Sequence, residues 1–167
     1  QRGRADGEVL ALLRQGLGDL LGTNVRAMAS SGDGSTNQWS IVSMTVKGKS
    51  EGSFVFTRSN VKTIAFGRLL GAGVYVGSTN PFSNQGAFGN TAQLDSSRRL
   101  ESISITAPFD LANFAFDTGS EVRAPAIGKV LINGNVNRAA GQPLGFVSGA
   151  FTSIKMRTTT GAALTVS

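Results

Sequence analysis

The chain has 167 residues, of which 22 are glycine and 16% are charged, and its formal net charge of +6 is spread along its length. It contains no Cys and no His, which excludes a disulfide framework, the usual zinc, copper and haem ligands, and catalysis by Ser-His-Asp or Cys-His groups. The composition therefore predicts a protein that is not an enzyme and that holds no cofactor and no metal, although a polyanionic partner is compatible with its charge.

Near the N-terminus, residues 6–22 are predicted to form an amphipathic helix with Asp6 as its N-cap. Gly16 and Gly18 weaken such a helix by about 1 kcal/mol each relative to Ala, so its apolar face needs a partner. That partner is either the protein's own sheet or a neighbouring subunit. The predicted subunit contacts are the leucines at helical spacing on this face: Leu10, Leu13, Leu17, Leu20 and Leu21.

From Trp39 onwards the pattern is that of β-strands. Trp39–Lys47 alternates, with Val42, Met44 and Val46 expected on one side. Asn133-Gly134 is a strong two-residue hairpin signal, and Ser53–Arg58 reads as the second arm of another hairpin. The remaining predicted strands are Val61–Phe66, Leu69–Val76, Leu100–Ala107, Phe109–Phe116, Ala126–Ile132, Asn135–Ala139, Leu144–Arg157 and Ala162–Val166.

Short strands separated by turn signals every 8–12 residues or so are typical of sandwiches and barrels. We therefore predict an all-β fold, a single antiparallel β-sandwich or barrel with one N-terminal amphipathic helix. The single domain 1–167 is divided into a basic arm (1–5), the helix (6–22), a linker (30–38) and a β-domain (39–167). Residues 77–93 are expected to form a long loop that reaches a neighbour.

Basic residues alternate with Phe54, Phe56 and Phe66 between positions 47 and 68, a pattern that could form a platform for single-stranded nucleic acid. The alternative is that strand alternation turns the phenylalanines to the core and the charges to water. The predicted nucleic-acid contacts are Arg2, Arg4, Lys47, Lys49, Arg58, Lys62 and Arg68.

Two further patterns favour ordinary structural roles. Asp33, Ser35 and Asn37 have the spacing of part of a calcium loop, but the later acidic ligand is missing, which favours a turn. Among the carboxylates, Asp95 and Glu101, like Asp110 and Asp117, lie close in sequence without defining a catalytic pair.

Low-charge sheets rich in Gly, Ser, Thr and Asn, with extended arms, suit proteins that bury surface against copies of themselves. The leading functional prediction is a structural subunit of a large homomeric assembly, with a virion component (capsid, decoration or tail-tube type) as its most natural instance and the virion as its location. The expected partners are copies of itself, other subunits of the assembly and nucleic acid. No apolar run approaches the length of about 18–20 residues that spans a bilayer.

Two other classes stay open. The first is a single-stranded nucleic-acid-binding β-domain that uses the basic segment. The second is a pore-forming or lectin-like protein, since an amphipathic helix ahead of a β-sandwich is similar to the layout of actinoporin-type pore formers. The aromatic, tyrosine-rich cluster of that family is absent from this sequence, which has one Tyr and one Trp.

Overall fold

The computed structural model describes residues 14–27, 38–79, 94–107, 115–117, 119–136, 145–157 and 163–166. Every helix or strand assigned within these ranges is a strand. The strands are β1 (Arg14–Leu17), β2 (Leu20–Leu21), β3 (Asn24–Ala27), β4 (Trp39–Glu51), β5 (Phe54–Thr57), β6 (Asn60–Leu70), β7 (Gly73–Val76), β8 (Arg99–Thr106), β9 (Glu121–Arg123), β10 (Ala126–Asn133), β11 (Gly145–Val147), β12 (Ala150–Arg157) and β13 (Ala163–Val166).

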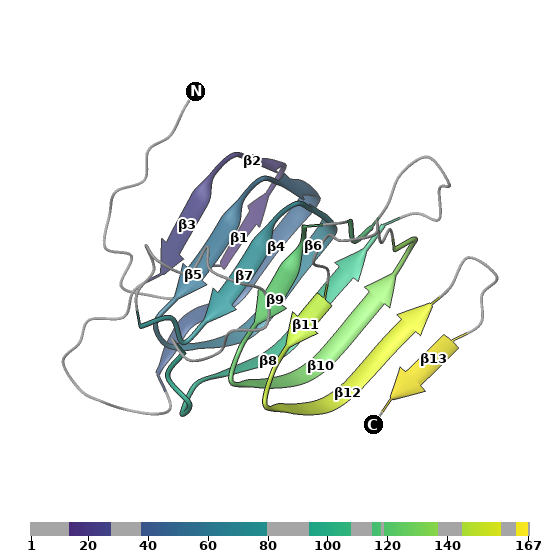
Figure 1. Cartoon of the computed structure of the whole chain (residues 1–167). Coiled ribbons are helices and arrows are strands. Elements are labelled where there is room, and N and C mark those ends of the chain that lie inside the picture. The colour runs from purple at the N-terminus through teal and green to yellow at the C-terminus, as the bar shows by residue number, and fades with distance from the viewer. Residues whose placement is uncertain are drawn as a thin grey trace.

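The strands form two sheets that face each other (Figure 1). The first sheet has the order β1-β4-β6-β8-β10-β12-β13, with β2 also paired to β4, and the second has the order β11-β9-β7-β5-β3. All pairs are parallel except β12 with β13. Because consecutive strands from β2 to β12 alternate between the sheets, the chain winds in coils, and each of these strands pairs with its equivalent one coil away. This is a parallel β-solenoid.

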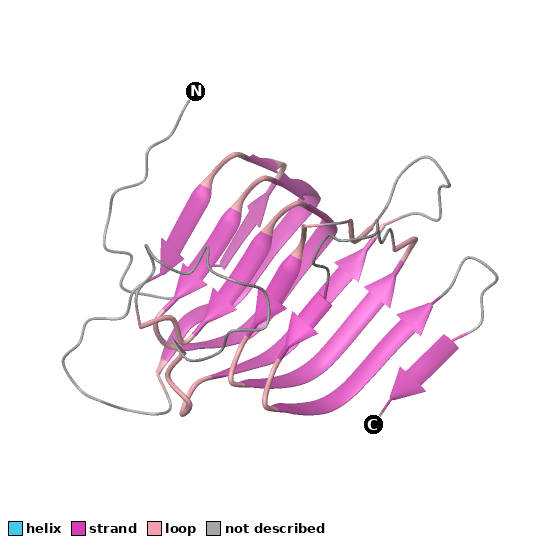
Figure 2. Cartoon of the chain, in the orientation of Figure 1, coloured by secondary structure: helices cyan, strands magenta, loops and turns pink. Residues whose placement is uncertain are grey.

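From β4 to β5 and from β6 to β7, short turns carry the chain from one sheet to the other (Figure 2). Gly52 and Gly71 occupy equivalent turns, and both have a positive φ, 56° and 52°, which favours glycine. The turns are themselves stacked, since the Gly52 N–H donates to the Leu70 carbonyl and the Gly73 N–H donates to the Ser53 carbonyl. Hydrogen bonding between coils therefore continues around the corners.

The core between the sheets consists of rows of equivalent apolar side chains. Each long strand from β4 to β12 repeats one pattern, apolar-x-x-apolar-x-apolar, and parallel pairing places the copies side by side. The three rows of the first sheet are Ile41–Val61–Leu100–Ile127–Phe151, Met44–Ile64–Ile103–Val130–Ile154 and Val46–Phe66–Ile105–Ile132–Met156. The second sheet contributes Val25–Val55–Val74–Val122–Phe146.

The first sheet bends where its pairing skips one position per strand. Pairing passes, for example, from Ile127–Phe151 to Lys129–Ser153. The chain approaches itself closely here, because a Cβ on Gly128 would lie 2.3 Å from the Glu101 carbonyl oxygen. Two consecutive residues therefore follow each first apolar position before the next inward one, which breaks simple alternation.

The predicted antiparallel sandwich or barrel is wrong, because the sheets are parallel. Ser53–Arg58 and Asn133-Gly134 do not make hairpins: β5 lies in the other sheet from β4, and β10 pairs in parallel with β8 and β12. In β4 the core residues are Ile41, Met44 and Val46, while Val42 is only half-buried. Several strands were therefore recognised, but not their partners, and β1, β2, β3 and β9 were not predicted. The predicted strands Leu69–Val76 and Leu144–Arg157 each cover parts of two strands.

The predicted N-terminal helix is also wrong. Its described part, from position 14 to position 22, contains β1 and β2, both paired in parallel with β4. Several predicted segments fall wholly or mostly outside the described residues. They are the basic arm 1–5, the start of the helix, the linker 30–38, most of the loop 77–93, and the predicted strands Phe109–Phe116 and Asn135–Ala139.

The row architecture predicts a position-dependent cost of truncation. Ile103 lies in the middle of its row and is 1% exposed, whereas Ile154, near the C-terminal end of the same row, is half-buried. Ile103→Ala is expected to lower the free energy of unfolding by about 2–5 kcal/mol, and Ile154→Ala by clearly less. Denaturant unfolding of the two variants measures the difference, and equal losses would contradict the continuous core.

Candidate functional site

The outward face of the first sheet carries rows of hydroxyl side chains. One row runs Ser43–Thr63–Ser102–Lys129–Ser153 and a second runs Thr45–Ala65–Ser104–Leu131–Lys155. The serines and threonines in these rows are half-buried, while Lys129, Leu131 and Lys155 are exposed. Neighbouring strands in a sheet lie about 4.8 Å apart, so each row is a regular series of hydrogen-bonding groups that becomes basic towards β12.

A shallow groove of about 550 Å³ crosses this face at the start of the strands. Its lining includes the basic side chains of Lys62, Arg99 and Lys129, the carboxylate of Glu101, and Phe151, which is 38% exposed. Three cations from three adjacent strands thus surround one groove with a single carboxylate. The arrangement suits an anionic ligand.

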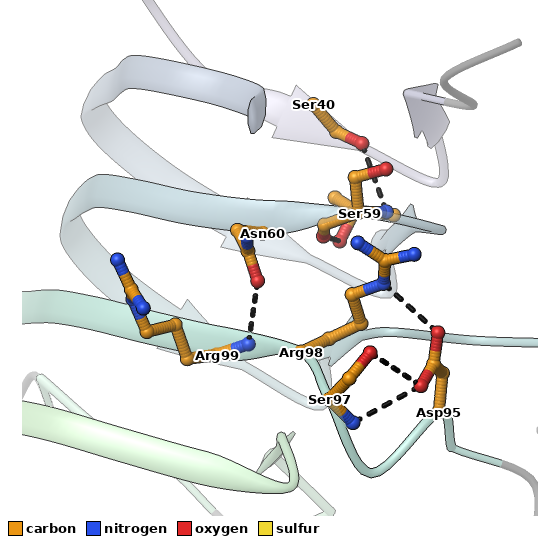
Figure 3. Close-up of polar contacts among 8 residues, drawn as sticks. Ser40, Ser59, Asn60, Asp95, Ser97, Arg98 and Arg99 are labelled. Carbon is orange, nitrogen blue, oxygen red and sulfur yellow. Dashed lines mark hydrogen bonds and ion pairs between the residues drawn. The ribbon is translucent and has the colours of Figure 1, made fainter. Parts of the chain in front are cut away.

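Arg99 is held in place by contacts at the start of β8 (Figure 3). Its backbone N–H donates to the Oδ1 atom of buried Asn60 at 2.9 Å. Its guanidinium group lies over the Trp39 ring, 5.2 Å from the centroid, and donates to Glu101 Oε1 at 3.3 Å. These contacts aim the guanidinium along the outward face while nearly half of its side chain stays exposed.

The turn before Arg99 is organised around Asp95 (Figure 3). The Asp95 carboxylate accepts hydrogen bonds from the Ser97 N–H at 3.0 Å, the Ser97 hydroxyl at 2.7 Å and Arg98 Nε at 2.9 Å. The hydroxyl of Ser97, followed by the other donors, lowers the pKa of Asp95 below its ordinary value of 3.8.

A second groove of about 350 Å³ lies on the same sheet, at the other end of its strands. It is lined by Lys47, Lys49 and Arg68, together with the carboxylate of Asp19. Asp19 Oδ1 accepts the Lys49 backbone N–H at 2.9 Å, and the Lys49 ammonium pairs with Glu51 at 2.6 Å. The hydrogen bond to Glu51 is the main cause that raises the pKa of Lys49.

Four of the predicted nucleic-acid contacts, Lys47, Lys49, Lys62 and Arg68, therefore lie on one face, in its two grooves. Arg58 is exposed in the turn after β5, away from that face, and Arg2 and Arg4 lie outside the described residues. Sequence reasoning missed the further cations of the face, Arg99, Lys129, Lys155 and Arg157. Apart from Arg99, at the start of β8, they could have been found from their outward positions in the repeated apolar pattern.

The phenylalanines expected to accompany these cations lie elsewhere. Phe66 is in the core, 1% exposed. Phe54 and Phe56 belong to the second sheet, where they form an aromatic cluster with Tyr75, and the Phe56 and Tyr75 rings stack at 5.1 Å. The expected alternation of aromatic and basic side chains on one surface is therefore not formed.

Tyr75 belongs to a buried polar cluster with Glu121 and Arg123. The Tyr75 hydroxyl donates to one Glu121 oxygen, and Arg123 Nε and Nη2 donate to the other at 2.8 and 2.7 Å. Gly73 leaves room for this contact, since a Cβ there would lie 2.7 Å from the Tyr75 ring. Burial, then the bond to Glu121, raises the pKa of Tyr75, the opposite of what a catalytic base near neutral pH requires. The cluster is structural, because each buried charge is paired.

The predicted subunit contacts on the leucine face are separated by the fold. Leu20 is buried, Leu17 is half-buried against the core, and Leu21 is 56% exposed. Leu10 and Leu13 lie outside the described residues, as do Asp33, Ser35 and Asn37. The three described leucines thus do not share one helical face.

The core is less covered at both ends of the solenoid than in its middle. In the row of the second sheet, Val55, Val74 and Val122 are at most 1% exposed, whereas Val25 at one end and Phe146 at the other are half-buried. In the third row of the first sheet, Leu17 at the β1 end is likewise half-buried, and Met156 is half-buried although β13 pairs with its strand. Apolar surface at a solenoid's ends is what a further coil would cover.

Within the described ranges, no three His, Cys, Asp or Glu side chains are close enough to hold a metal ion together. The same ranges contain no helix of the length and hydropathy needed to cross a membrane. Comparison of the chain with protein-family models, characterised proteins and solved structures finds no match.

Tyr75 is the sole tyrosine of the chain, so its ionisation can be followed by ultraviolet absorbance. Its raised pKa means that the folded state holds the phenolic proton more tightly than the unfolded state does. Stability is therefore unaffected below pH 10.0, the ordinary value, and falls as the pH rises above it. We expect tyrosinate to appear in the native protein only well above pH 10, and near pH 10 in denaturant. Ionisation near pH 10 in the folded protein would contradict the buried cluster.

The Asp95 turn predicts an effect in acid. Its lowered pKa contributes stability that is present above about pH 4 and is lost as the pH falls through the folded-state value. Asp95→Asn is expected to lower the thermal midpoint at pH 7 and to flatten its dependence on pH below 4. Thermal melting curves of the wild type and the variant at pH 7 and pH 3 measure this. If the thermal midpoint of the variant falls below pH 4 as steeply as that of the wild type, other carboxylates cause the loss of stability in acid.

Proposed function

We propose that the chain is a non-enzymatic structural module that assembles end to end with copies of itself. The observation that carries the proposal is the valine row of the second sheet, which is fully buried in the middle and half-buried at Val25 and Phe146. Apolar surface of this kind is stabilised when another layer of the same pattern covers it.

The direction of the edge strands supports stacking of one end on the other. Among the described strands, β3 pairs only with β5, and β11 pairs only with β9, both in parallel. All five strands of this sheet run the same way, so a copy translated along the axis presents its β3 edge to the β11 edge with the same strand direction. Phe146 of one copy and Val25 of the next then face each other across the junction, while β12 and β13 at one end and β1 with β2 at the other extend the first sheet towards it.

The first sheet supports a junction of the same polarity. Its two edges differ, since β1 and β2 form one and the antiparallel β13 forms the other. An end that differs from its opposite end favours a heterologous, head-to-tail contact, which does not close on itself unless a rotation makes a ring. The assembly proposed here is linear, which suits a fibre or a tube better than a closed shell. A virion tail or fibre component is one instance of such a role.

Two charge-introducing variants test the junction. Val25→Lys blocks one end and Phe146→Lys blocks the other, because each would leave an ammonium group facing an apolar row. The full-length wild type is expected to form a concentration-dependent series of oligomers in light scattering and native mass measurement. Either variant alone is expected to stay monomeric to concentrations at least ~10-fold higher, equivalent to about 1.4 kcal/mol.

A mixture of the two blocked variants gives the most specific test of the junction. The intact ends of the two variants are complementary, so an equimolar mixture should form dimers and nothing longer. Leu131→Lys, at an outward position that is 43% exposed, is the matched control and should assemble like the wild type. Circular dichroism confirms that each variant is folded. A wild type that is monomeric at all concentrations, or blocked variants that still form long oligomers, would refute the proposal.

A further inference from the structure

The outward face of the first sheet carries most of the charge of the protein. Its lysines and arginines are Lys47, Lys49, Lys62, Arg68, Arg99, Lys129, Lys155 and Arg157, and the carboxylates on or beside it are Asp19, Glu51 and Glu101. Among the side chains that the structure describes on this face, eight cations against three carboxylates leave a surplus of five, and the whole chain carries +6. End-to-end assembly involves the edges of the sheets and leaves this face uncovered.

The cations are distributed along a path and not gathered at one point. Lys62, Arg99 and Lys129 belong to three adjacent strands at one groove, and Lys47, Lys49 and Arg68 line the second groove at the other end of the strands. Half-buried hydroxyls line the first groove at Thr63 and Ser102, and those of Thr45 and Ser104 follow on the same strands towards the second groove. A ligand that uses both grooves must therefore be extended and must offer anionic groups together with hydroxyls.

We infer that this face binds a linear acidic polysaccharide, a chain of sugars that carry carboxylate or sulfate groups. Lysine and arginine side chains pair with its anionic groups, and the serine and threonine rows match sugar hydroxyls, since each hydroxyl can both donate and accept. The side chain of Leu131, an outward residue that is 43% exposed, offers apolar surface to the non-polar faces of sugar rings.

The distribution of aromatic side chains favours a polysaccharide over single-stranded nucleic acid. Nucleic-acid platforms stack successive bases on aromatic rings. Here Phe66 lies in the core, while Phe54, Phe56 and Tyr75 form a cluster on the second sheet. Among the described residues beside the basic face, Trp39 is already covered by the Arg99 guanidinium and Phe151 lines one groove from its place in a core row, which is too few for a series of bases.

Each exposed ion pair is individually weak, so the binding must depend on many contacts along one polymer. Affinity is therefore expected to rise steeply with polymer length until the ligand reaches both grooves, and to fall with added salt. A single sugar acid is expected to bind too weakly to detect.

The test is isothermal titration of the full-length protein with four polymers of similar length: polygalacturonate (carboxylated), heparin (sulfated), dextran (neutral) and single-stranded oligothymidylate. Binding to polygalacturonate, to heparin or to both, with none to dextran, supports the inference and identifies the anionic group. Oligothymidylate that binds as tightly as the acidic polysaccharides at equal salt would overturn it in favour of nucleic acid. No binding to either acidic polysaccharide would refute it outright.

Variants of equal charge separate a specific face from general attraction to a basic protein. Lys62→Gln and Lys129→Gln are each expected to weaken binding about two- to fivefold, and the double variant about 4- to 25-fold. Arg58→Gln removes the same charge from an exposed turn outside the face and is expected to change affinity less than about twofold. Equal losses for Arg58→Gln and Lys129→Gln would contradict a site. Unchanged thermal midpoints show that the variants are folded.

The same titrations on Val25→Lys keep the two proposals apart. That variant retains the basic face but is blocked at one end, so its monomers should still bind the acidic polymer. If the wild type does not assemble while both proteins bind the polymer, the end-to-end proposal alone is wrong. If binding fails while the wild type assembles, this inference alone is wrong.

Discussion

Parallel pairing of equivalent strands is the constraint on which the rest of the structure depends. In a parallel pair each residue lies beside its equivalent in the next coil, so one position of the repeat becomes one row of the solenoid. An inward position must therefore be apolar in every coil, and an outward position builds a surface that repeats at about the strand spacing. The buried core, the hydroxyl rows and the half-covered ends all follow from this rule.

A local sequence pattern indicates which residues of a strand are buried, but not which strand lies beside it. Many strands could therefore be predicted, and the fold could not. A two-residue turn ordinarily indicates an antiparallel hairpin, whereas here it carries the chain into the other sheet, and the partner strand comes a full coil later. The repeat was hidden by its uneven length. Equivalent residues lie at positions 41, 61, 100, 127 and 151, with offsets of 20, 39, 27 and 24. Searching for the recurring apolar-x-x-apolar-x-apolar pattern, and not for a fixed period, would have found it.

The N-terminal leucines and the basic segment show how tertiary context decided the local outcome. Leu17 and Leu20 have helical spacing, but the glycines between and beside them weaken a helix, and pairing with β4 stabilises strands instead. The basic segment was partly predictable, because residues that are not in the core rows face outward on the same sheet. The change of sheet after Glu51 then removed Phe54 and Phe56 from that face, which no period in the sequence indicates.

End-to-end stacking and polymer binding would reinforce each other through geometry. Copies would stack along the solenoid axis, across the strands, so each added copy would place another basic face beside the first. A long polymer bound to one copy would meet the next at high effective concentration, and its affinity would rise without any new kind of contact. By reciprocity, the polymer would stabilise the junctions between copies. A scaffold of this kind needs no catalytic groups, because its function would rest on the repetition of one surface.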